Sequence, residues 1–488
     1  MRSFAALFFV VVASLTSVSC TLAPHFVRPD FSAAMFWKKP SQKSELTPVR
    51  ADESEAQTPT PITWRQYYRN PALRQLIARA LKHNADVKKA ALNVKEARAL
   101  YRVERAGLLP SLNVDASGML GERSDAAGLA GNYPSDDSYS VALSAPAYAL
   151  DFFGGAQSRT KAQYERYLQT AHASKAARLT VITETASAYI RLLADRKLLL
   201  LTERTLEAQR NTLALLANSR DVGAAADQDV ARAETAVETA RVNLHRYRRF
   251  VEQDVNALFV LLGERRSDET LPNVEIKDAD FITDIRPGLP SALLLARPDV
   301  MQAESSLKAA NADIGSARAA FFPSITLTGA YGFASGDLKD LFASSAAGAW
   351  SFVPRITVPI FQGGRLKGAL DAAKIRKEKA VLDYENVIRV AFKDVSNALT
   401  ARQTLKEQSD AQARLVKAAQ RAYNLSKVRY DSGVDSFLSV LDAQRELYAF
   451  EQGALSVGAE RLQALSAVYA AFGGNAALSS AVKKQALN

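Results

Sequence analysis

The sequence predicts a mixed α+β membrane protein that consists mostly of long α-helices and is built from two copies of one unit. Three observations predict this fold class. The chain has two very long stretches without a helix breaker and four short stretches that alternate apolar with polar residues. Each half of the chain contains one of the long stretches and two of the short ones, in the same order. The composition of the 488 residues, 48% apolar and 23% charged, fits neither a fully disordered chain nor a helical protein that crosses a membrane many times.

The chain repeats itself at a nearly constant spacing. Residues 86–117 align without a gap on residues 299–330, which is an offset of 213. Further along, equivalent glycines lie 210 residues apart, namely Gly223 with Gly433 and Gly263 with Gly473. We therefore expect two repeats that share one fold.

Each repeat contains a very long helical stretch. Residues 156–222 hold neither glycine nor proline, and a helix of that length would reach roughly 100 Å. The equivalent run is 369–432, and each run ends at a glycine that leads into a second, shorter helical segment, which predicts paired helical hairpins. Both runs carry an apolar seven-residue pattern of the coiled-coil kind, at Leu179, Ile182, Ala186, Tyr189 and Leu193 and again at Ile388, Ala391, Val395 and Ala398. A simple antiparallel coiled coil is the alternative interpretation of these runs.

Four alternating stretches contradict a simple coiled coil. They predict strands near 111–120, 138–148, 323–334 and 350–361, each with one apolar and one polar face. In an outer-membrane barrel the apolar face meets lipid and the polar face lines a wet lumen. Four strands cannot close a barrel, so the barrel must be shared between chains, and three chains are the smallest assembly whose twelve strands leave a channel. Pro354 and Pro359 argue against a central position for the last strand.

The N-terminus predicts export and a lipid anchor. Residues 1–19 resemble a signal peptide with a short apolar core, and the only cysteine, Cys20, follows directly after it. Small residues before Cys20 are typical of a bacterial lipobox, although Ser17 departs from the leucine that this pattern prefers. We expect a covalent lipid on Cys20 and an extended tether over residues 20–65. A secreted protein with a free thiol is the alternative.

The composition indicates no catalytic, metal or cofactor site. One cysteine and four scattered histidines provide no cluster of metal ligands, and no phosphate-binding loop or Ser-His-Asp arrangement occurs. We expect no enzyme activity and no cofactor apart from the lipid. The net charge of +11 arises from basic residues interleaved with acidic ones along the helices, which favours solvated helix faces over nucleic-acid binding.

These features together resemble the bacterial outer-membrane efflux channels of the TolC and OprM type, particularly the NodT-like lipoprotein branch that serves resistance-nodulation-division (RND) pumps. The resemblance covers essentially the whole mature chain. The order and spacing of its motifs carry it: LAPHFVRP at 22–29, the segment 64–97, YALDFFGG at 148–155, VPIFQGG at 358–364 and YDSGVDSFLSVLDAQRELY at 430–448.

The resemblance implies a homotrimer with a twelve-stranded barrel in the outer membrane of a Gram-negative bacterium and a helical tunnel in the periplasm. Each chain would supply a first repeat (66–268), an inter-repeat equatorial linker (269–290), a second repeat (291–474) and a C-terminal tail (475–488). The implied function is a passive exit duct for small molecules such as drugs, delivered by an inner-membrane RND transporter through a periplasmic adaptor. A duct for type I protein or peptide secretion and a non-conducting, envelope-spanning lipoprotein are the alternatives.

The resemblance also implies a gate at the periplasmic tip of the tunnel. The matching turns are 222–230 and 431–441, around Gly223 and Gly433, and Ser439 departs from the second carboxylate of the TolC branch. The alternative is that the polar residues of these turns only cap or solvate helix ends. The residues that match the family's gate are Tyr430, Asp229, Asp442 and Arg445.

Overall fold

The structure is a computed structural model, and it describes residues 21–29, 62–121, 137–266, 271–282, 294–342 and 348–474. The chain divides into two compact units. Unit 1 comprises Met1–Asp30, Asn93–Thr170 and Ala303–Tyr384, and unit 2 comprises Phe31–Leu92, Ala171–Gln302 and Glu385–Asn488. The predicted signal peptide and Cys20 lie outside the described residues.

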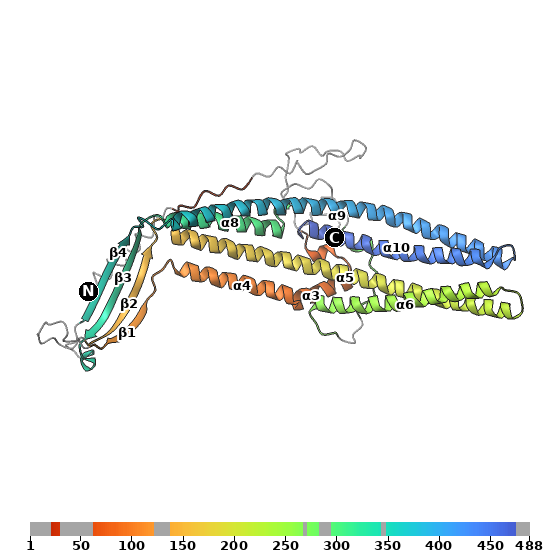
Figure 1. The fold of residues 1–488 in the computed structure, drawn as a ribbon, viewed down its shortest axis with the longest axis horizontal. Coiled ribbons are helices and arrows are strands. Elements are labelled where there is room, and N and C mark those ends of the chain that lie inside the picture. The colour runs from red at the N-terminus through yellow and green to blue at the C-terminus, as the bar shows by residue number, and fades with distance from the viewer. Residues whose placement is uncertain are drawn as a thin grey trace, which may run out of the picture. The chain divides into compact units, whose positions relative to one another are not determined.

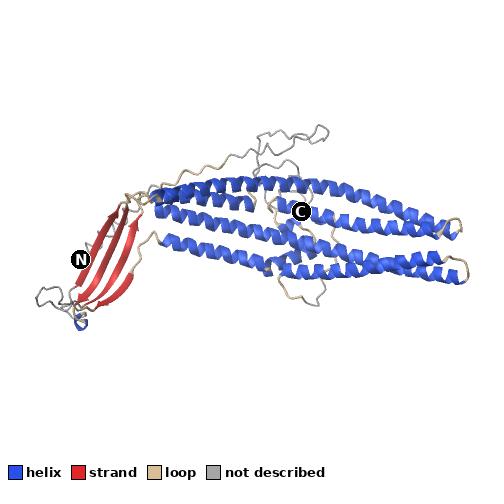
Figure 2. Cartoon of the chain, viewed as in Figure 1, coloured by secondary structure: helices blue, strands red, loops and turns tan. Residues whose placement is uncertain are grey.

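One antiparallel sheet forms in unit 1, with the strands side by side in the order β1-β2-β3-β4 (Figures 1 and 2). The strands are β1 (Asn113–Met119), β2 (Ser138–Leu150), β3 (Ser324–Ser335) and β4 (Gly348–Thr357). Each of these strands lies within a few residues of one of the four ranges expected from the sequence. Since β1 and β4 each pair with one neighbour, they form the two edges of the sheet.

Prolines mark the irregular points of this sheet. Pro354 lies in β4, an edge strand, where a residue without a backbone N–H is tolerated, and β4 ends before Pro359. In β2 the pairing with β3 shifts between Ala145 and Tyr148. There Ala147 adopts a positive φ of 47° and its N–H donates to Thr328 Oγ1 at 3.1 Å, so the side chain of β3 replaces a ladder partner.

The helices follow the breaker pattern of the sequence. The longest are α5 (Gly155–Asp221) and α9 (Arg365–Asp431), each followed by a shorter partner, α6 (Asp227–Leu262) and α10 (Phe437–Ala471). Gly453 and Gly458 do not interrupt α10. The remaining helical segments are α2 (Trp64–Tyr67), α3 (Pro71–His83), α4 (Ala85–Ala106), η3 (Asp278–Asp280), α8 (Pro298–Ala319) and η4 (Leu338–Asp340).

A break at Asn84 separates α3 from α4, although residues 72–106 contain neither glycine nor proline. The carboxamide oxygen of Asn84 accepts from the N–H groups of Asp86 at 2.8 Å and Val87 at 3.2 Å. Its amide nitrogen donates to Leu261 O at 2.9 Å, on α6. Asn84 therefore acts as the N-cap of α4 and joins it to α6 within unit 2.

The seven-residue pattern lies in the core of unit 2. Ile182, Ala186 and Tyr189 of α5 are buried, and the equivalent positions of α9 are buried as well. A second part of this core is aromatic: Tyr67 stacks on Tyr469 at 4.7 Å between ring centroids. The hydroxyl of Tyr68 lies 2.7 Å from Ser466 Oγ, which satisfies a fully buried phenol. Among the described residues, no helix is long and apolar enough to cross a membrane.

Candidate functional site

The sheet of unit 1 has one apolar and one polar face. Because the strands pair in register, Val114, Leu143, Tyr331 and Trp350 form one row across all four strands. The adjacent row points to the other face and consists of Asn113, Ser144, Ala330 and Ser351. Val114 and Trp350 are 74% and 75% exposed within the chain. The apolar face is therefore uncovered, as in a sheet that meets lipid.

Two helix turns in unit 2 share one backbone conformation, and both are the turns that the sequence analysis places at the gate. Gly223 and Gly433 adopt positive φ values of 77° and 69°, which glycine accommodates without strain. In each turn the glycine N–H and the next N–H donate to carbonyls of the preceding helix, which is the usual C-terminal cap. The bonds are Gly223 to Arg220 (2.8 Å), Ala224 to Ser219 (2.7 Å), Gly433 to Tyr430 (2.9 Å) and Val434 to Arg429 (2.9 Å).

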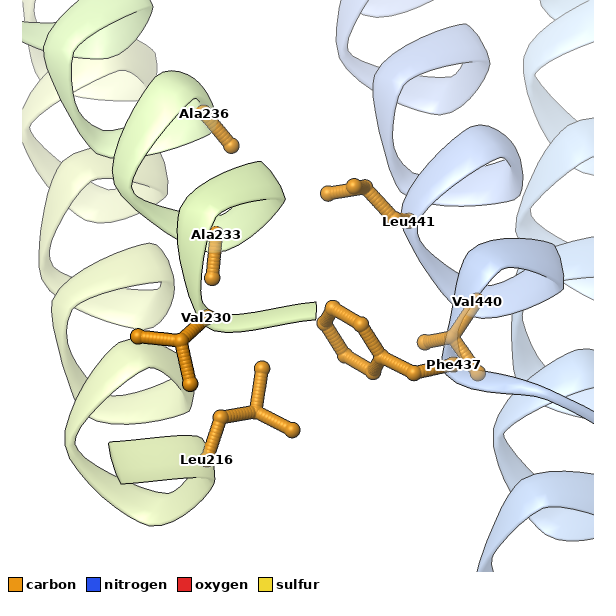
Figure 3. Close-up of a cluster of buried hydrophobic side chains, with 7 residues drawn as sticks. All are labelled: Leu216, Val230, Ala233, Ala236, Phe437, Val440 and Leu441. Atoms are coloured by element: carbon orange, nitrogen blue, oxygen red, sulfur yellow. The ribbon is translucent and has the colours of Figure 1, made fainter. Parts of the chain in front are cut away.

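An apolar cluster joins the two hairpins beside these turns. Side chains from α5 and α6 point toward side chains from α10, and all are buried (Figure 3). Tyr430 packs against this cluster, with its ring centroid 5.6 Å from that of Phe437. The cluster consists of Leu216, Val230, Ala233, Ala236, Phe437, Val440 and Leu441.

The carboxylate predicted for the first turn does not meet Tyr430 within the chain. The described contact of Asp229 is an ion pair with Arg232 at 3.9 Å, one helical turn further along α6. Within one chain the structure brings Tyr430 and Asp229 to the same group of helix ends without linking them.

Asp442 and Arg445 line a groove of about 760 Å³ between α6 and α10. Their side chains lie 3.5 Å apart on one face of α10. Arg232 of α6 lines the same groove, as does Glu446. Two of the predicted gate residues are therefore gathered with further charges on a surface that both hairpins of the chain form.

Asp435 in the second turn is a site residue that was not predicted from the sequence. Its carboxylate accepts from the Ser436 N–H at 2.9 Å, Ser439 Oγ at 3.0 Å and Arg429 Nε at 3.2 Å. These hydrogen bonds lower the pKa of Asp435, and the bond from the backbone N–H of Ser436 has the largest effect. The sequence offered one signal for it, an acidic residue directly before the N-cap Ser436, at the end of a helix that favours negative charge. Ser439, which departs from the family pattern, thus has a structural use in this chain.

The residues that follow Cys20 are held by unit 1. Residues 21–29 lie against α8, and the contact includes a pair of hydrogen bonds from Arg28 to Glu304 at 2.7 and 2.8 Å. The first described part of the expected tether is thus a bound segment. In the part of the chain that the structure describes, no group of three or more His, Cys, Asp or Glu side chains is placed to hold a metal ion.

Comparison with known proteins gives one consistent result. The family model described as "Outer membrane efflux protein" matches residues 76–264 and 289–474. The toluene efflux pump outer membrane protein TtgC of Pseudomonas putida is 41% identical over 93% of this chain and 92% of its own length. The outer membrane protein OprJ of Pseudomonas aeruginosa is 36% identical over 95% of both chains. The crystal structure of the open state of the MtrE outer membrane channel of Neisseria gonorrhoeae superposes with a TM-score of 0.81 at 35% identity, covering 94% of this chain and 99% of that one.

Proposed function

Because the chain belongs to the outer membrane efflux protein family, we propose that it is the outer-membrane channel of a tripartite efflux pump and a passive exit duct for small molecules. An inner-membrane RND transporter supplies the energy, and a periplasmic adaptor connects it to the channel. The toluene in the name of one relative supports small toxic compounds as the cargo. The chain's part in this transport requires no catalysis and no cofactor.

The observation that carries this proposal is the sheet. Four strands with an uncovered apolar face and two edges form only part of a closed wall. Unpaired strand edges are not tolerated in lipid, so other copies of the chain must pair with β1 and β4. Three copies give twelve strands and a lumen, whereas two give eight strands whose interior side chains fill. The functional unit is therefore a homotrimer.

The trimer is tested by native mass spectrometry in detergent and by conductance in planar bilayers. Three chains and a defined single-channel conductance are expected. A dominant monomer would overturn the shared sheet, and a trimer without conductance would favour a non-conducting envelope lipoprotein. Secretion of a protein substrate by cells that express this channel would favour the type I alternative.

The proposed gate uses the turns of unit 2. Tyr430 keeps its ring in the apolar cluster and offers its hydroxyl to a neighbouring chain, where Asp229 is the proposed acceptor. Asp442 and Arg445 provide charge-assisted links along the groove. An exposed link contributes up to about 1 kcal/mol, but three symmetry copies act on one opening equilibrium and together change it by ~3 kcal/mol, or roughly a hundredfold.

The double variant Tyr430→Phe with Asp442→Ala tests this gate. It keeps the ring that packs on Phe437 and removes only polar links, so resting conductance should rise while the trimer stays equally stable. Asp431→Ala is the matched control, because Asp431 pairs with Lys427 at 2.7 Å in the same turn and has no proposed gate role. If the double variant conducts like the parent, the four residues only cap and solvate the helix ends.

We also propose that Cys20 carries the lipid anchor. An exported chain with a single cysteine has no disulfide partner for it within the chain. Cys20→Ala should leave a trimer that still folds, because the sheet faces offer much more apolar surface to the membrane than an acyl chain does. Mass spectrometry of the mature chain measures the modification directly, and an unmodified Cys20 would contradict it.

A further inference from the structure

Residues 21–29, here called the strap, follow α8 along most of its length in unit 1. Arg318 Nη1 donates to Leu22 O at 3.2 Å, close to the C-terminal end of α8. Asn311 Nδ2 donates to Pro24 O at 2.8 Å, and the ammonium of Lys308 lies 5.5 Å from the ring centroid of Phe26. As the strap runs from its N-terminal to its C-terminal end, its contacts move from the C-terminal toward the N-terminal end of α8. The strap and α8 are therefore antiparallel.

The far end of the strap closes on a buried charge. Glu304 is 7% exposed, and both of its carboxylate oxygens accept from Arg28 Nη2. Lys308 adds an ion pair at 2.9 Å. Burial alone would raise the pKa of Glu304, but the hydrogen bonds from Arg28 and Lys308 outweigh it and the pKa is lowered. A buried carboxylate depends on such partners, so Arg28 stabilises α8 as well as the strap.

Gly315 provides the space that the middle of the strap occupies. A Cβ at this position would lie 2.8 Å from Ala23 Cα and 2.5 Å from Ser158 Oγ, and both distances are shorter than real Cβ contacts. Ala23 belongs to the strap, and Ser158 belongs to the first turn of α5. Any side chain at position 315 must therefore displace one of these two neighbours.

The first repeat lacks this site. The alignment that relates the two repeats pairs Glu304 with Ala91, Asn311 with Arg98 and Gly315 with Arg102. An alanine cannot bind Arg28, and an arginine in place of Gly315 would fill the space of Ala23. Lys308 and Arg318 have identical counterparts in Lys95 and Arg105, so Glu304, Asn311 and Gly315 are the strap contacts that only the second repeat has.

The strap ends where helices meet strands. Leu22 binds Arg318, the residue before the end of α8 at Ala319. The strand β3 begins shortly afterwards, at Ser324. Thr21 Oγ1 lies 3.3 Å from Ser158 Oγ, near the start of α5. Cys20 lies outside the described residues and is the next residue along the chain, so the proposed anchor is attached directly to this end of the strap.

We infer that α8 carries a docking site for the strap, formed by Glu304, Asn311 and Gly315, which holds the chain's own lipid anchor at the level where the sheet begins. The inference rests on the proposed lipid at Cys20 for its purpose, but the docking itself does not need the lipid. The site is specific to the second repeat, and each chain therefore docks its own strap once. Docking, rather than the acyl chain, fixes the position of residues 21–29.

A spin label on Val27→Cys tests the docking in the full-length chain. Val27 is 74% exposed, so the label reports the motion of the strap without replacing a contact. We expect an immobilised line shape in the parent. The line shape should shift to a mobile one in Arg28→Gln, which removes the ion pair with Glu304, and in Gly315→Arg, which installs the residue of the first repeat. Asp313→Asn is the matched control on the same helix, because Asp313 binds Arg166 at 2.6 Å instead of the strap.

Each outcome decides the inference. A mobile label in the parent, or an immobilised label in both Arg28→Gln and Gly315→Arg, would overturn it. The same measurement on a Cys20→Ala background separates docking from lipidation, because a docked strap stays immobilised there. If Cys20 is unmodified, mass spectrometry finds a second label on the chain, which contradicts the proposed lipid and leaves the docking result to stand by itself.

Discussion

The turn between α5 and α6 and the turn between α9 and α10 have the same backbone and different side chains. Both place a glycine at positive φ and close the same two hydrogen bonds. Yet Arg220 and Asp227 of the first turn correspond to Tyr430 and Phe437 of the second. At these two positions the first turn is thus polar and solvated, while the second contributes an aromatic pair to the cluster that joins the hairpins.

The long helix pairs differ in the same way. In the first repeat, Asp195 of α5 lies against Asp254 of α6, and Arg191 pairs with Asp254 at 2.7 Å. The equivalent positions of α9 and α10 are Leu405 and Ala464. At this position the first hairpin therefore carries two carboxylates, whereas the equivalent position of the second carries two apolar side chains. The duplication thus preserves the turns and the lengths of the helices, while the two copies have separate tasks in packing.

The largest expected difference between the turns concerns Phe437. Phe437→Ala empties a buried position at the centre of the cluster and should destabilise the turn region by about 3 kcal/mol. Its counterpart Asp227 is 91% exposed, so Asp227→Ala should stay within about 0.5 kcal/mol of the parent. Native-state hydrogen exchange of the first turns of α10 and α6 measures both. Equal effects would mean that the cluster does not join the hairpins.

Much of this backbone could be predicted from the sequence. Helix lengths, both turns, the four strands and the duplication follow from the positions of Gly223, Gly433 and the alternating residues, because breakers and periodicity act locally. The break at Asn84 was not predicted, since an asparagine also occurs within helices and only its bonds to Asp86, Val87 and Leu261 reveal a cap.

The side-chain partners could not be predicted in the same way. Whether Asp195 faces Asp254 depends on how two long helices are rotated about their axes, which a sequence pattern determines only coarsely. The docking of the strap was even harder to predict, because Arg28 and Glu304 are far apart along the chain and neither belongs to a local motif. The family resemblance marked residues 22–29 as characteristic but gave no partner for them.

The acidic pair of the first repeat predicts a pH dependence. Burial, together with the hydrogen bond and charge of Asp254, raises the pKa of Asp195 from 3.8 to about 7. Between these values the folded chain holds a proton that the unfolded chain has lost, so the stability contributed by this group falls as pH rises through that window. The variant Asp195→Asn removes this pH-dependent loss of stability. After discounting for its partial exposure to solvent, the variant should exceed the parent by about 2 kcal/mol above neutral pH and match it near the lower end of the window.

Leu405→Asn is the control for this comparison, because it places the same amide at the equivalent position of the second repeat, where no carboxylate pair exists. Its effect on stability should not change with pH. Unfolding followed by circular dichroism at several pH values measures both variants. An Asp195→Asn advantage that is independent of pH would show that the two carboxylates do not share a proton.

The smallest expected effect tests what the turns have in common. Gly223→Ala and Gly433→Ala each place a Cβ on a residue at positive φ, where an L-residue costs about 1 kcal/mol. Apart from the adjacent residues, no atom of the described residues lies within 4 Å of either new Cβ, so the whole cost comes from the backbone and should be equal in the two turns. Hydrogen exchange of the amides that close each turn measures it. A difference of more than about 0.5 kcal/mol would mean that the unlike side chains, and not the shared backbone alone, set the stability of these turns.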